Sequence, residues 1–168
     1  RLRVAGGVSL NNAGLKNRLK QKNYQRYLAE LIEKYSLAGC VEFLPPLKAD
    51  EMKKMYLRSN VFVSPSSIEN SPNSLGEAMM LGVPCVSSLV GGVGNMLING
   101  AEGFTYQHDA PYMLAYYVME IFRLQKENRQ QLADMTDMAH SHAMSLFDSE
   151  KNAANMLEIY SGIERIKR

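Results

Sequence analysis

The stretch that decides the fold reads SPSSIENSPNSLGEAMMLGVP and runs from Ser64 to Pro84. It follows an uninterrupted apolar run at residues 61–63 and leads into a second strand-like segment at residues 84–87. Its second half has the character of a helix and stops at Gly82, a residue type that often ends helices. A strand, a polar loop, a helix and another strand in this order are typical of a parallel sheet that is buried on both faces.

The same alternation continues on both sides of this stretch. Short apolar segments predict strands, and apolar residues spaced three and four apart predict helices. We therefore predict an α/β fold with a doubly wound, Rossmann-like parallel sheet and a helical C-terminal end, in one domain over residues 1–168. Strands are expected at residues 2–5, 41–44, 61–63, 84–87 and 103–106, and helices near residues 24–35, 50–56, 74–81, 110–126, 128–146 and 149–165.

Several side chains have a predicted structural use. Asp50 and Asp109 precede helical segments and are expected to cap them, with Pro111 inside the first turn of the later helix. Cys40 and Cys85 lie beside apolar strand residues, so both are expected to be buried thiols. The first long helix is expected to face the core with Tyr24, Tyr27, Leu28, Leu31, Ile32 and Tyr35.

The composition of the chain argues against several classes of function. Hydrophobic residues make up 46% of the 168 residues and charged residues 21%, a balance typical of a globular protein. The net charge of +2 hides a stretch, residues 61–122, that contains five acidic residues and no Lys or Arg. Two Cys and three scattered His argue against a metal site, and no apolar run reaches the roughly 18 residues that span a bilayer. No basic-aromatic groove indicates nucleic-acid binding.

Two carboxylates frame the start of the helix that follows the loop. Glu69 lies on the loop, and Glu77 lies within the helix. The backbone N–H groups of Asn73, Ser74 and Leu75 would form the open end of that helix, where unpaired donors and the helix dipole favour a phosphate. Asn73 and Ser74 could also cap the helix with their side chains. Because carboxylates accept hydrogen bonds from sugar hydroxyls, we expect a nucleotide ribose on one side and a transferred sugar on the other.

These residues form a pattern that resembles a known family. The arrangement P-S-x-x-E-x-x-P-N-x-x-x-E-A-M-x-x-G-x-P holds Glu69 and Glu77 at an E-x7-E spacing. It resembles the donor-binding signature of the family-4 retaining glycosyltransferases, which have the GT-B fold. The resemblance extends over most of the chain, because further segments match the family in order, at residues 2–7, 41–44, 59–63, 91–92 and 99–104.

The resemblance implies roles for these residues. The residue matching Glu69 lies beside the donor sugar in the family and is the catalytic candidate, whereas the residue matching Glu77 accepts hydrogen bonds from the ribose. The loop amides hold the diphosphate. Asn70 and Ser71 replace the common glycine–aromatic pair after the first Glu, a change expected to affect which sugar is accepted. The remaining donor-binding residues are expected to be Gly6, Phe43, Leu44, Gly91 and Gly92.

The resemblance also implies the donor substrate of the enzyme and the parts of the enzyme that this chain lacks. It would be the donor-binding domain of a metal-independent glycosyltransferase that needs no cofactor and uses a UDP-, GDP- or ADP-linked sugar. The family's first strand and its cationic residues have no counterpart before Arg1. We therefore expect a domain truncated at its N-terminal edge, an acceptor domain that is absent, and no turnover by the isolated chain. A cytoplasmic location is expected, with membrane contact only through the missing part.

Two alternatives stay open at this point. One is a nucleotide-sugar epimerase of related fold, which would need acid and base residues beyond those identified. The other is a non-catalytic α/β interaction module that has kept the fold. Titration with UDP, GDP and ADP discriminates between a nucleotide-binding enzyme and such a module.

Overall fold

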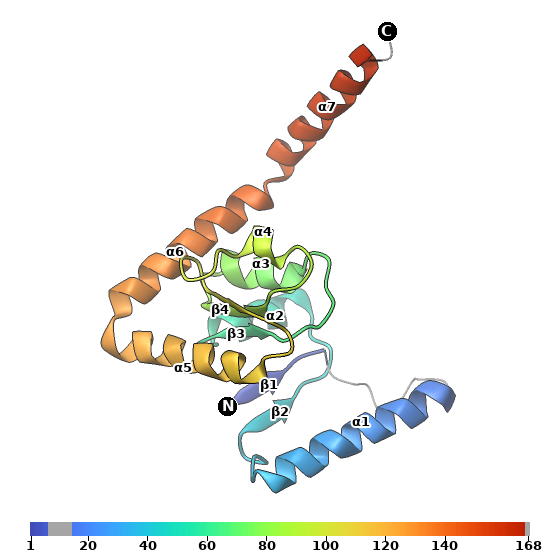
Figure 1. Ribbon diagram of the computed structural model, residues 1–168, viewed down its shortest axis with the longest axis vertical. Helices are drawn as coiled ribbons and strands as arrows, with labels where there is room; N and C mark the ends of the chain where they lie inside the picture. The colour runs from blue at the N-terminus through green and yellow to red at the C-terminus, as the bar shows by residue number, and fades with distance from the viewer. Residues whose placement is uncertain (7–14, 167–168) are drawn as a thin grey trace. The chain divides into compact units, whose positions relative to one another are not determined.

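The computed structural model describes residues 1–6 and 15–166 and has the parallel α/β architecture that the sequence predicts (Figure 1). The chain forms two compact units, Arg1–Met52 and Lys53–Arg168, and each has its own parallel sheet. The described strands therefore do not join into one continuous sheet. The elements are β1 (Leu2–Val4), α1 (Leu15–Lys34), β2 (Val41–Phe43), α2 (Ala49–Leu57), β3 (Phe62–Ser64), α3 (Asn73–Met80), β4 (Cys85–Ser88), α4 (Val93–Met96), β5 (Phe104–Tyr106), α5 (Pro111–Glu127), α6 (Arg129–Leu146) and α7 (Ser149–Ile166).

The first unit has a two-stranded sheet in which β1 pairs in parallel with β2, with Leu2 opposite Val41. The prediction of a parallel sheet that is buried on both faces is wrong for these two strands, because Leu2 on β1 is 53% exposed and Phe43 on β2 is 50% exposed. Cys40, which precedes β2, is exposed as well. A sheet of only two strands gives its side chains few neighbours to pack against, which explains these exposures.

The residues predicted to face the core form an apolar stripe on helix α1, but those whose burial is described are buried only in part. The stripe consists of Tyr24, Tyr27, Leu28, Leu31, Ile32 and Tyr35. Tyr27 and Tyr35 are more than half exposed, and the stripe residues between them are half-buried or exposed. Gly7 and residues 8–14, where the sequence predicts a glycine turn and a polar loop, lie outside the described residues, as does the side chain of Tyr24. The expected core packing of the whole stripe is therefore not found in the part that the structure describes.

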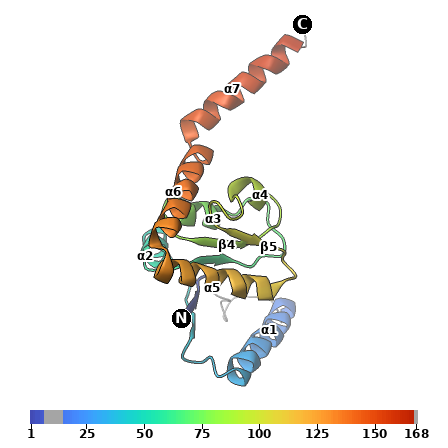
Figure 2. The same ribbon diagram turned by 60° about the vertical axis from the view of Figure 1, so that its left-hand side comes forward.

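The second unit is built around a three-stranded parallel sheet in the order β3-β4-β5. Helices α3 and α5 cover opposite faces of this sheet (Figures 1 and 2). All four residues of the central strand β4 are buried, since it has a strand on each side and a helix on each face. The expectation of a buried thiol at Cys85 is confirmed, and burial raises the pKa of that thiol.

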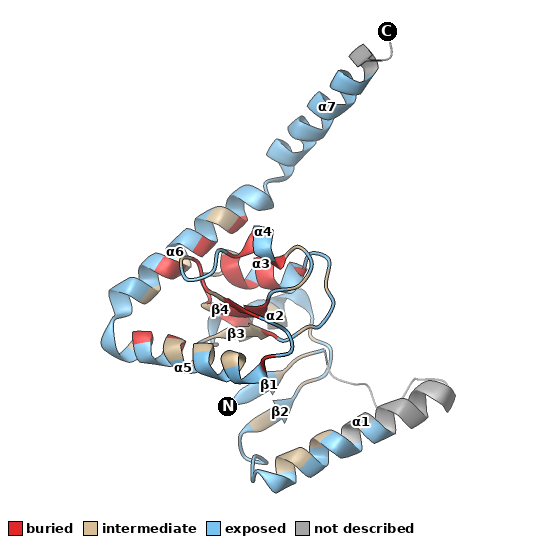
Figure 3. Cartoon of the chain, in the orientation of Figure 1, coloured by how far each residue is buried: buried red, intermediate tan, exposed pale blue. Residues whose placement is uncertain are grey.

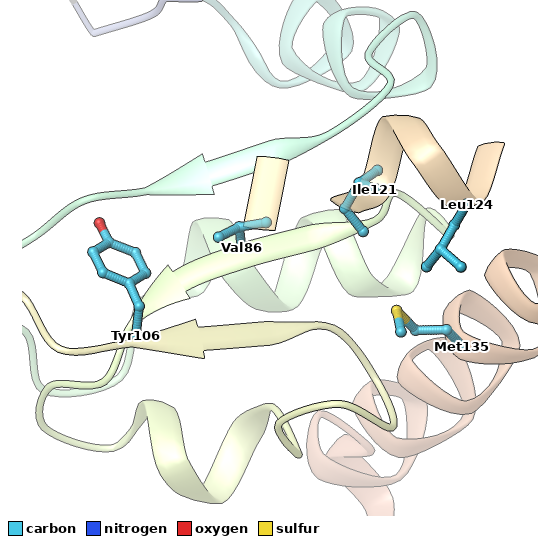
Figure 4. Close-up of a cluster of buried hydrophobic side chains, with 5 residues drawn as sticks. All are labelled: Val86, Tyr106, Ile121, Leu124 and Met135. Atoms are coloured by element: carbon cyan, nitrogen blue, oxygen red, sulfur yellow. The ribbon is translucent and has the colours of Figure 1, made fainter. Parts of the chain in front are cut away.

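A hydrophobic cluster joins the sheet of the second unit to the C-terminal helices (Figure 4). Each of these side chains is at most 5% exposed, so the cluster removes most of its apolar area from water. Helix α7, by contrast, is exposed at every residue described for burial (Figure 3). None of the helices in the described part of the chain is long and apolar enough to cross a membrane. The cluster consists of Val86 on β4, Tyr106 on β5, Ile121 and Leu124 on α5, and Met135 on α6.

Two histidines fix α6 to the rest of the second unit. A ring nitrogen of His142 lies 2.9 Å from the carboxylate of Glu102, which is 4% exposed and also accepts the N–H of Ile98 at 2.9 Å. A ring nitrogen of His140 lies 2.8 Å from the carbonyl oxygen of Met80 at the end of α3. A buried carboxylate needs such partners to offset its loss of hydration, so the pair has a structural role.

The predicted helix caps are mostly wrong. Helix α5 begins after Ala110, one residue later than a cap at Asp109 requires, although Pro111 occupies the first turn as predicted. Helix α2 already includes Asp50, and the carboxylate of Glu51 accepts the N–H of Lys48. Asn128 caps α6 by accepting the N–H of Gln131. One residue of register decides whether a side chain can reach the free N–H groups, and sequence patterns rarely fix a boundary that closely.

We predict that Leu124→Ala destabilises the second unit by about 2–5 kcal/mol, because it leaves a cavity in the cluster of Figure 4. The matched control Leu157→Ala, at a residue of α7 that is 70% exposed, should change the unfolding free energy by less than about 0.5 kcal/mol. Urea unfolding measures both. Equal losses in the two variants would contradict the position of the core.

Candidate active site

The predicted site residues of the second unit gather at one edge of its sheet. Because β3, β4 and β5 are parallel, their carboxyl ends meet at this edge, and residues 65–72 and 89–92 leave it as loops. In open parallel α/β sheets, ligands bind outside the carboxyl ends of the strands. The loop after β3 carries Glu69, and α3, which follows it, carries Glu77.

Ser88, the last residue of β4, fixes the beginning of the first loop from within the sheet. Its hydroxyl lies 2.5 Å from the carbonyl oxygen of Ser66 and 3.3 Å from that of Ser64. A hydroxyl donates one hydrogen at a time, so the shorter contact is the main bond. Ser88 is fully buried, and this bond therefore sets the direction in which the chain leaves β3 toward Glu69.

The glycine turn at Gly91 and Gly92 packs directly on the backbone of the first loop. Gly91 has a φ of +52°, and a Cβ atom there would overlap the carbonyl oxygen of Glu69. The N–H of Gly92 donates to the carbonyl oxygen of Asn70 at 2.5 Å. Any side chain at Gly91 would therefore collide with the Glu69 backbone. The family resemblance implied donor binding by this turn; the structure shows that the turn packs on the loop that carries Glu69.

The short helix α4, which the sequence did not predict, holds the other end of the first loop. The hydroxyl of Ser71 donates to the sulfur of Met96 at 3.3 Å, and Met96 is 5% exposed. Ser71 and Asn70 are both exposed, but the side chain of Ser71 is bonded within the fold. Of the two residues that replace the family's glycine–aromatic pair, Asn70 is the one whose side chain makes no hydrogen bond within the described part of the chain.

Glu69 is half-buried and has a defined carboxylate position. The hydroxyl of Ser66 donates to its Oε1 at 2.9 Å, from three residues earlier in the same loop. No other side-chain bond to this carboxylate is found in the described part of the chain. The sequence identified Glu69 but not Ser66; the P-S-x-x-E pattern contains the necessary spacing, although spacing alone does not show which side chain bonds to which.

Glu77 is exposed on α3 and accepts a hydrogen bond from Tyr56, a buried residue of α2. The phenolic hydroxyl of Tyr56 lies 3.2 Å from Oε2 of Glu77 and 3.2 Å from the carbonyl oxygen of Ser74. Tyr56 is 3% exposed, and its ring packs against Phe62 with 5.7 Å between centroids. The sequence placed Tyr56 on a short helix with Met52 and Met55 but gave no sign of the bond to Glu77.

The beginning of α3 offers fewer free donors than the sequence predicts. Pro72 is the cap residue and makes no side-chain capping bond, so neither Asn73 nor Ser74 caps this helix. The N–H of Leu75 donates to the carbonyl oxygen of Pro72 at 3.0 Å, and the Leu75 side chain is fully buried. The backbone N–H groups of Asn73 and Ser74 remain as the available donors among the three predicted.

The first unit contains the other predicted site residues, Gly6, Phe43 and Leu44. Gly6 has a φ of +84° and open space where a Cβ would lie. Phe43 is half exposed at the end of β2, and the N–H of Leu44 donates to the carbonyl oxygen of Val4 at 2.8 Å. Phe43 is the last residue of β2, and Gly6 and Leu44 follow the ends of β1 and β2, at the edge where open parallel sheets bind ligands.

The electrostatics of the site come from carboxylates and backbone groups. The stretch from residue 61 to residue 122 contains no Lys or Arg, so an anion bound at α3 would meet N–H donors and the positive end of the helix dipole. Within residues 1–6 and 15–166, no group of three or more His, Cys, Asp or Glu is arranged to hold a metal ion.

Comparison with known proteins identifies the family to which this chain belongs. The sequence profile of the family described as "Glycosyl transferases group 1" matches residues 1–136. The D-inositol 3-phosphate glycosyltransferase of Paenarthrobacter aurescens is 30% identical over 133 residues, which cover 79% of this chain and 31% of that protein. The chain thus spans about a third of the length of the curated relatives it matches.

Solved structures agree on the fold. The sucrose-phosphate synthase of Thermosynechococcus elongatus superposes with a TM-score of 0.78 at 22% identity, covering 98% of this chain and 39% of that one. Anabaena HepE, solved with UDP-glucose, superposes with a TM-score of 0.70 at 22% identity, covering 84% of this chain and 37% of that one. The fold is therefore the Rossmann-like one of GT-B glycosyltransferases. The chain belongs to the group 1 glycosyltransferase family.

We predict that Gly91→Ala is more destabilising than Gly100→Ala. Both residues have positive φ, and alanine at such a position costs on the order of 1 kcal/mol. A Cβ atom at Gly100 would have no heavy atom within 4 Å, whereas one at Gly91 would meet the Glu69 carbonyl. The collision should add about 1–3 kcal/mol, measured by urea unfolding. Similar losses in the two variants would show that the two loops do not pack as described.

Proposed function

We propose that this domain binds a nucleotide-diphosphate sugar and is the donor half of a retaining, metal-independent glycosyltransferase. The observation that carries the proposal is the arrangement at the start of α3. Two backbone N–H groups are open there, with Glu69 on the loop before them and Glu77 one turn into the helix. This arrangement suits a ligand that has phosphates in its middle and hydroxyl groups at both ends.

The proposed reaction breaks the bond between the sugar's anomeric carbon and the diphosphate oxygen. The electron pair goes to the diphosphate, and the acceptor hydroxyl supplies the oxygen of the new bond while losing its proton. Negative charge therefore grows on the leaving phosphate, where the amides of Asn73 and Ser74 and the dipole of α3 would stabilise it. A helix end contributes roughly 0.3–2 kcal/mol, so cationic groups from elsewhere in the protein would add to it.

The two carboxylates have different proposed partners. Glu69, oriented by Ser66, would lie beside the donor sugar, and Glu77 would accept hydrogen bonds from the ribose hydroxyls. Asn70 is exposed next to Glu69 and would contact the sugar, which makes it a candidate for sugar selection. Gly6, Phe43 and Leu44 remain proposed contacts of the nucleotide.

UDP is the first nucleotide to test, because the HepE structures contain UDP or UDP-glucose. An ADP-bound relative, the starch synthase IV of Arabidopsis thaliana, makes ADP the second. The acceptor domain is proposed to belong to the same protein, and a cytoplasmic location remains our expectation. The epimerase alternative predicts conversion of the nucleotide sugar without an acceptor, and the interaction module predicts no nucleotide binding.

We predict that UDP binds saturably and that Glu77→Ala weakens its binding about tenfold or more, because hydrogen bonds from ribose to a carboxylate are lost. Isothermal titration of UDP measures this in the protein at its natural length. The matched control is Glu158→Ala, which removes an exposed carboxylate from α7 and should leave the affinity unchanged. Unchanged UDP affinity in Glu77→Ala would contradict the assignment of this residue to the ribose.

A separate prediction concerns the reaction step. Glu69→Gln should lower the rate of sugar transfer by about a hundredfold or more, while thermal unfolding stays within a few degrees of the unmodified protein. A coupled assay for released nucleotide diphosphate measures the rate. Transfer at a near-normal rate would remove Glu69 from the catalytic site, and anomeric inversion in the product would exclude the retaining mechanism.

A further inference from the structure

The bond between Tyr56 and Glu77 joins a fully enclosed side chain to an exposed carboxylate. Tyr56 is 3% exposed on α2, in the part of that helix that belongs to the second unit, and Glu77 lies on the open face of α3. The hydroxyl reaches Oε2 of Glu77 at 3.2 Å. No other side-chain bond to Glu77 occurs in the described part of the chain, so Oε1 of this exposed residue has no protein partner there.

An exposed glutamate normally samples several rotamers, and ordering such a side chain costs conformational entropy. The Tyr56 ring is held by its packing on Phe62 and by its burial, so its hydroxyl has a fixed position. A fixed donor at Oε2 selects the Glu77 rotamers that keep this oxygen inward. The other oxygen is then presented outward before any ligand arrives.

The phenol stays a donor throughout the neutral range. Burial and the neighbouring charge of Glu77 raise the pKa of Tyr56 well above its ordinary value, since both disfavour a phenolate. The one hydrogen of this hydroxyl is shared with a second acceptor at the same 3.2 Å, the carbonyl oxygen of Ser74 in the first turn of α3. Tyr56 therefore contacts both the Glu77 carboxylate and the end of α3 that carries the free N–H groups, and it holds the carboxylate in a fixed position relative to that end.

We infer that Tyr56 is a positioning residue for donor recognition, which orients the Glu77 carboxylate so that one oxygen is ready to accept hydrogen bonds from the ribose hydroxyls of the bound nucleotide. The inference rests on the proposed function, because it concerns the same ligand. Tyr56 itself is enclosed and does not touch the nucleotide; its effect passes through Glu77.

The test compares UDP with 2′,3′-dideoxy-UDP, which lacks the ribose hydroxyls, in the protein at its natural length. Tyr56→Phe keeps the ring and removes only the hydroxyl. It should weaken UDP binding roughly five- to tenfold and change binding of the dideoxy analogue by less than about twofold. Tyr117→Phe is the matched control: this ring also stacks on an aromatic residue, Phe104, with 4.7 Å between centroids, and its hydroxyl makes no bond to Glu77.

Two further variants separate positioning from a structural role. In a Glu77→Ala background, Tyr56→Phe should have no further effect on UDP affinity, because the hydroxyl then has only Ser74 to bond. Glu77→Asp shortens the side chain of an exposed residue and should leave folding unchanged. It withdraws the carboxylate from the phenol and should reproduce the loss of UDP affinity seen in Tyr56→Phe.

The outcomes are distinct. Equal weakening of UDP and the dideoxy analogue by Tyr56→Phe, or a full effect that persists without Glu77, would overturn the inference in favour of a structural role. Unchanged UDP binding in Tyr56→Phe, with binding lost in Glu77→Ala, would overturn it while leaving the proposed function intact. Failure of the unmodified protein to bind UDP, ADP or GDP would overturn the proposed function and this inference with it.

Discussion

The hydrogen bond from the Gly92 N–H to the Asn70 carbonyl depends on a backbone approach that only glycine permits. At Gly91 the next loop comes so close to Glu69 that there is no room for a Cβ atom. This contact brings together two loops that leave neighbouring parallel strands. With Ser88 fixing the start of the first loop and Met96 accepting from Ser71 near its end, Glu69 is held on a supported segment. The position of the catalytic candidate thus follows from backbone packing.

Both carboxylates of the site are oriented by neutral hydroxyl groups. Ser66 donates to Glu69 and Tyr56 donates to Glu77, and neither bond introduces a positive charge. A cationic partner would pair with a carboxylate more strongly and compete with the sugar or ribose hydroxyls that it is proposed to accept. The absence of Lys and Arg between residues 61 and 122 fits this arrangement, because any cations that meet the diphosphate then come from other parts of the protein.

Much of the fold could be predicted because it rests on local patterns. The segments predicted as strands at residues 61–63 and 84–87 are short and bounded by turn residues, and the strands Phe62–Ser64 and Cys85–Ser88 lie there. The helices after Pro111 were predicted within a residue or two. The predictions that failed depend on neighbours or on exact register. Cys40 and Leu2 are exposed because β1 and β2 form a sheet of only two strands, and Asp109 misses its cap by one residue.

For the site, the sequence alone was sufficient to identify the E-x7-E pair and to place its two carboxylates around the start of a helix, because those features lie within a few residues of one another. It could not show that the Leu75 amide is already bonded to Pro72, that Gly91 lies against Glu69, or that Tyr56 bonds to Glu77. Tyr56 is 21 residues from Glu77 and Gly91 is 22 residues from Glu69. Contacts over such separations arise when strands pair and helices pack, so the tertiary fold was needed to reveal them.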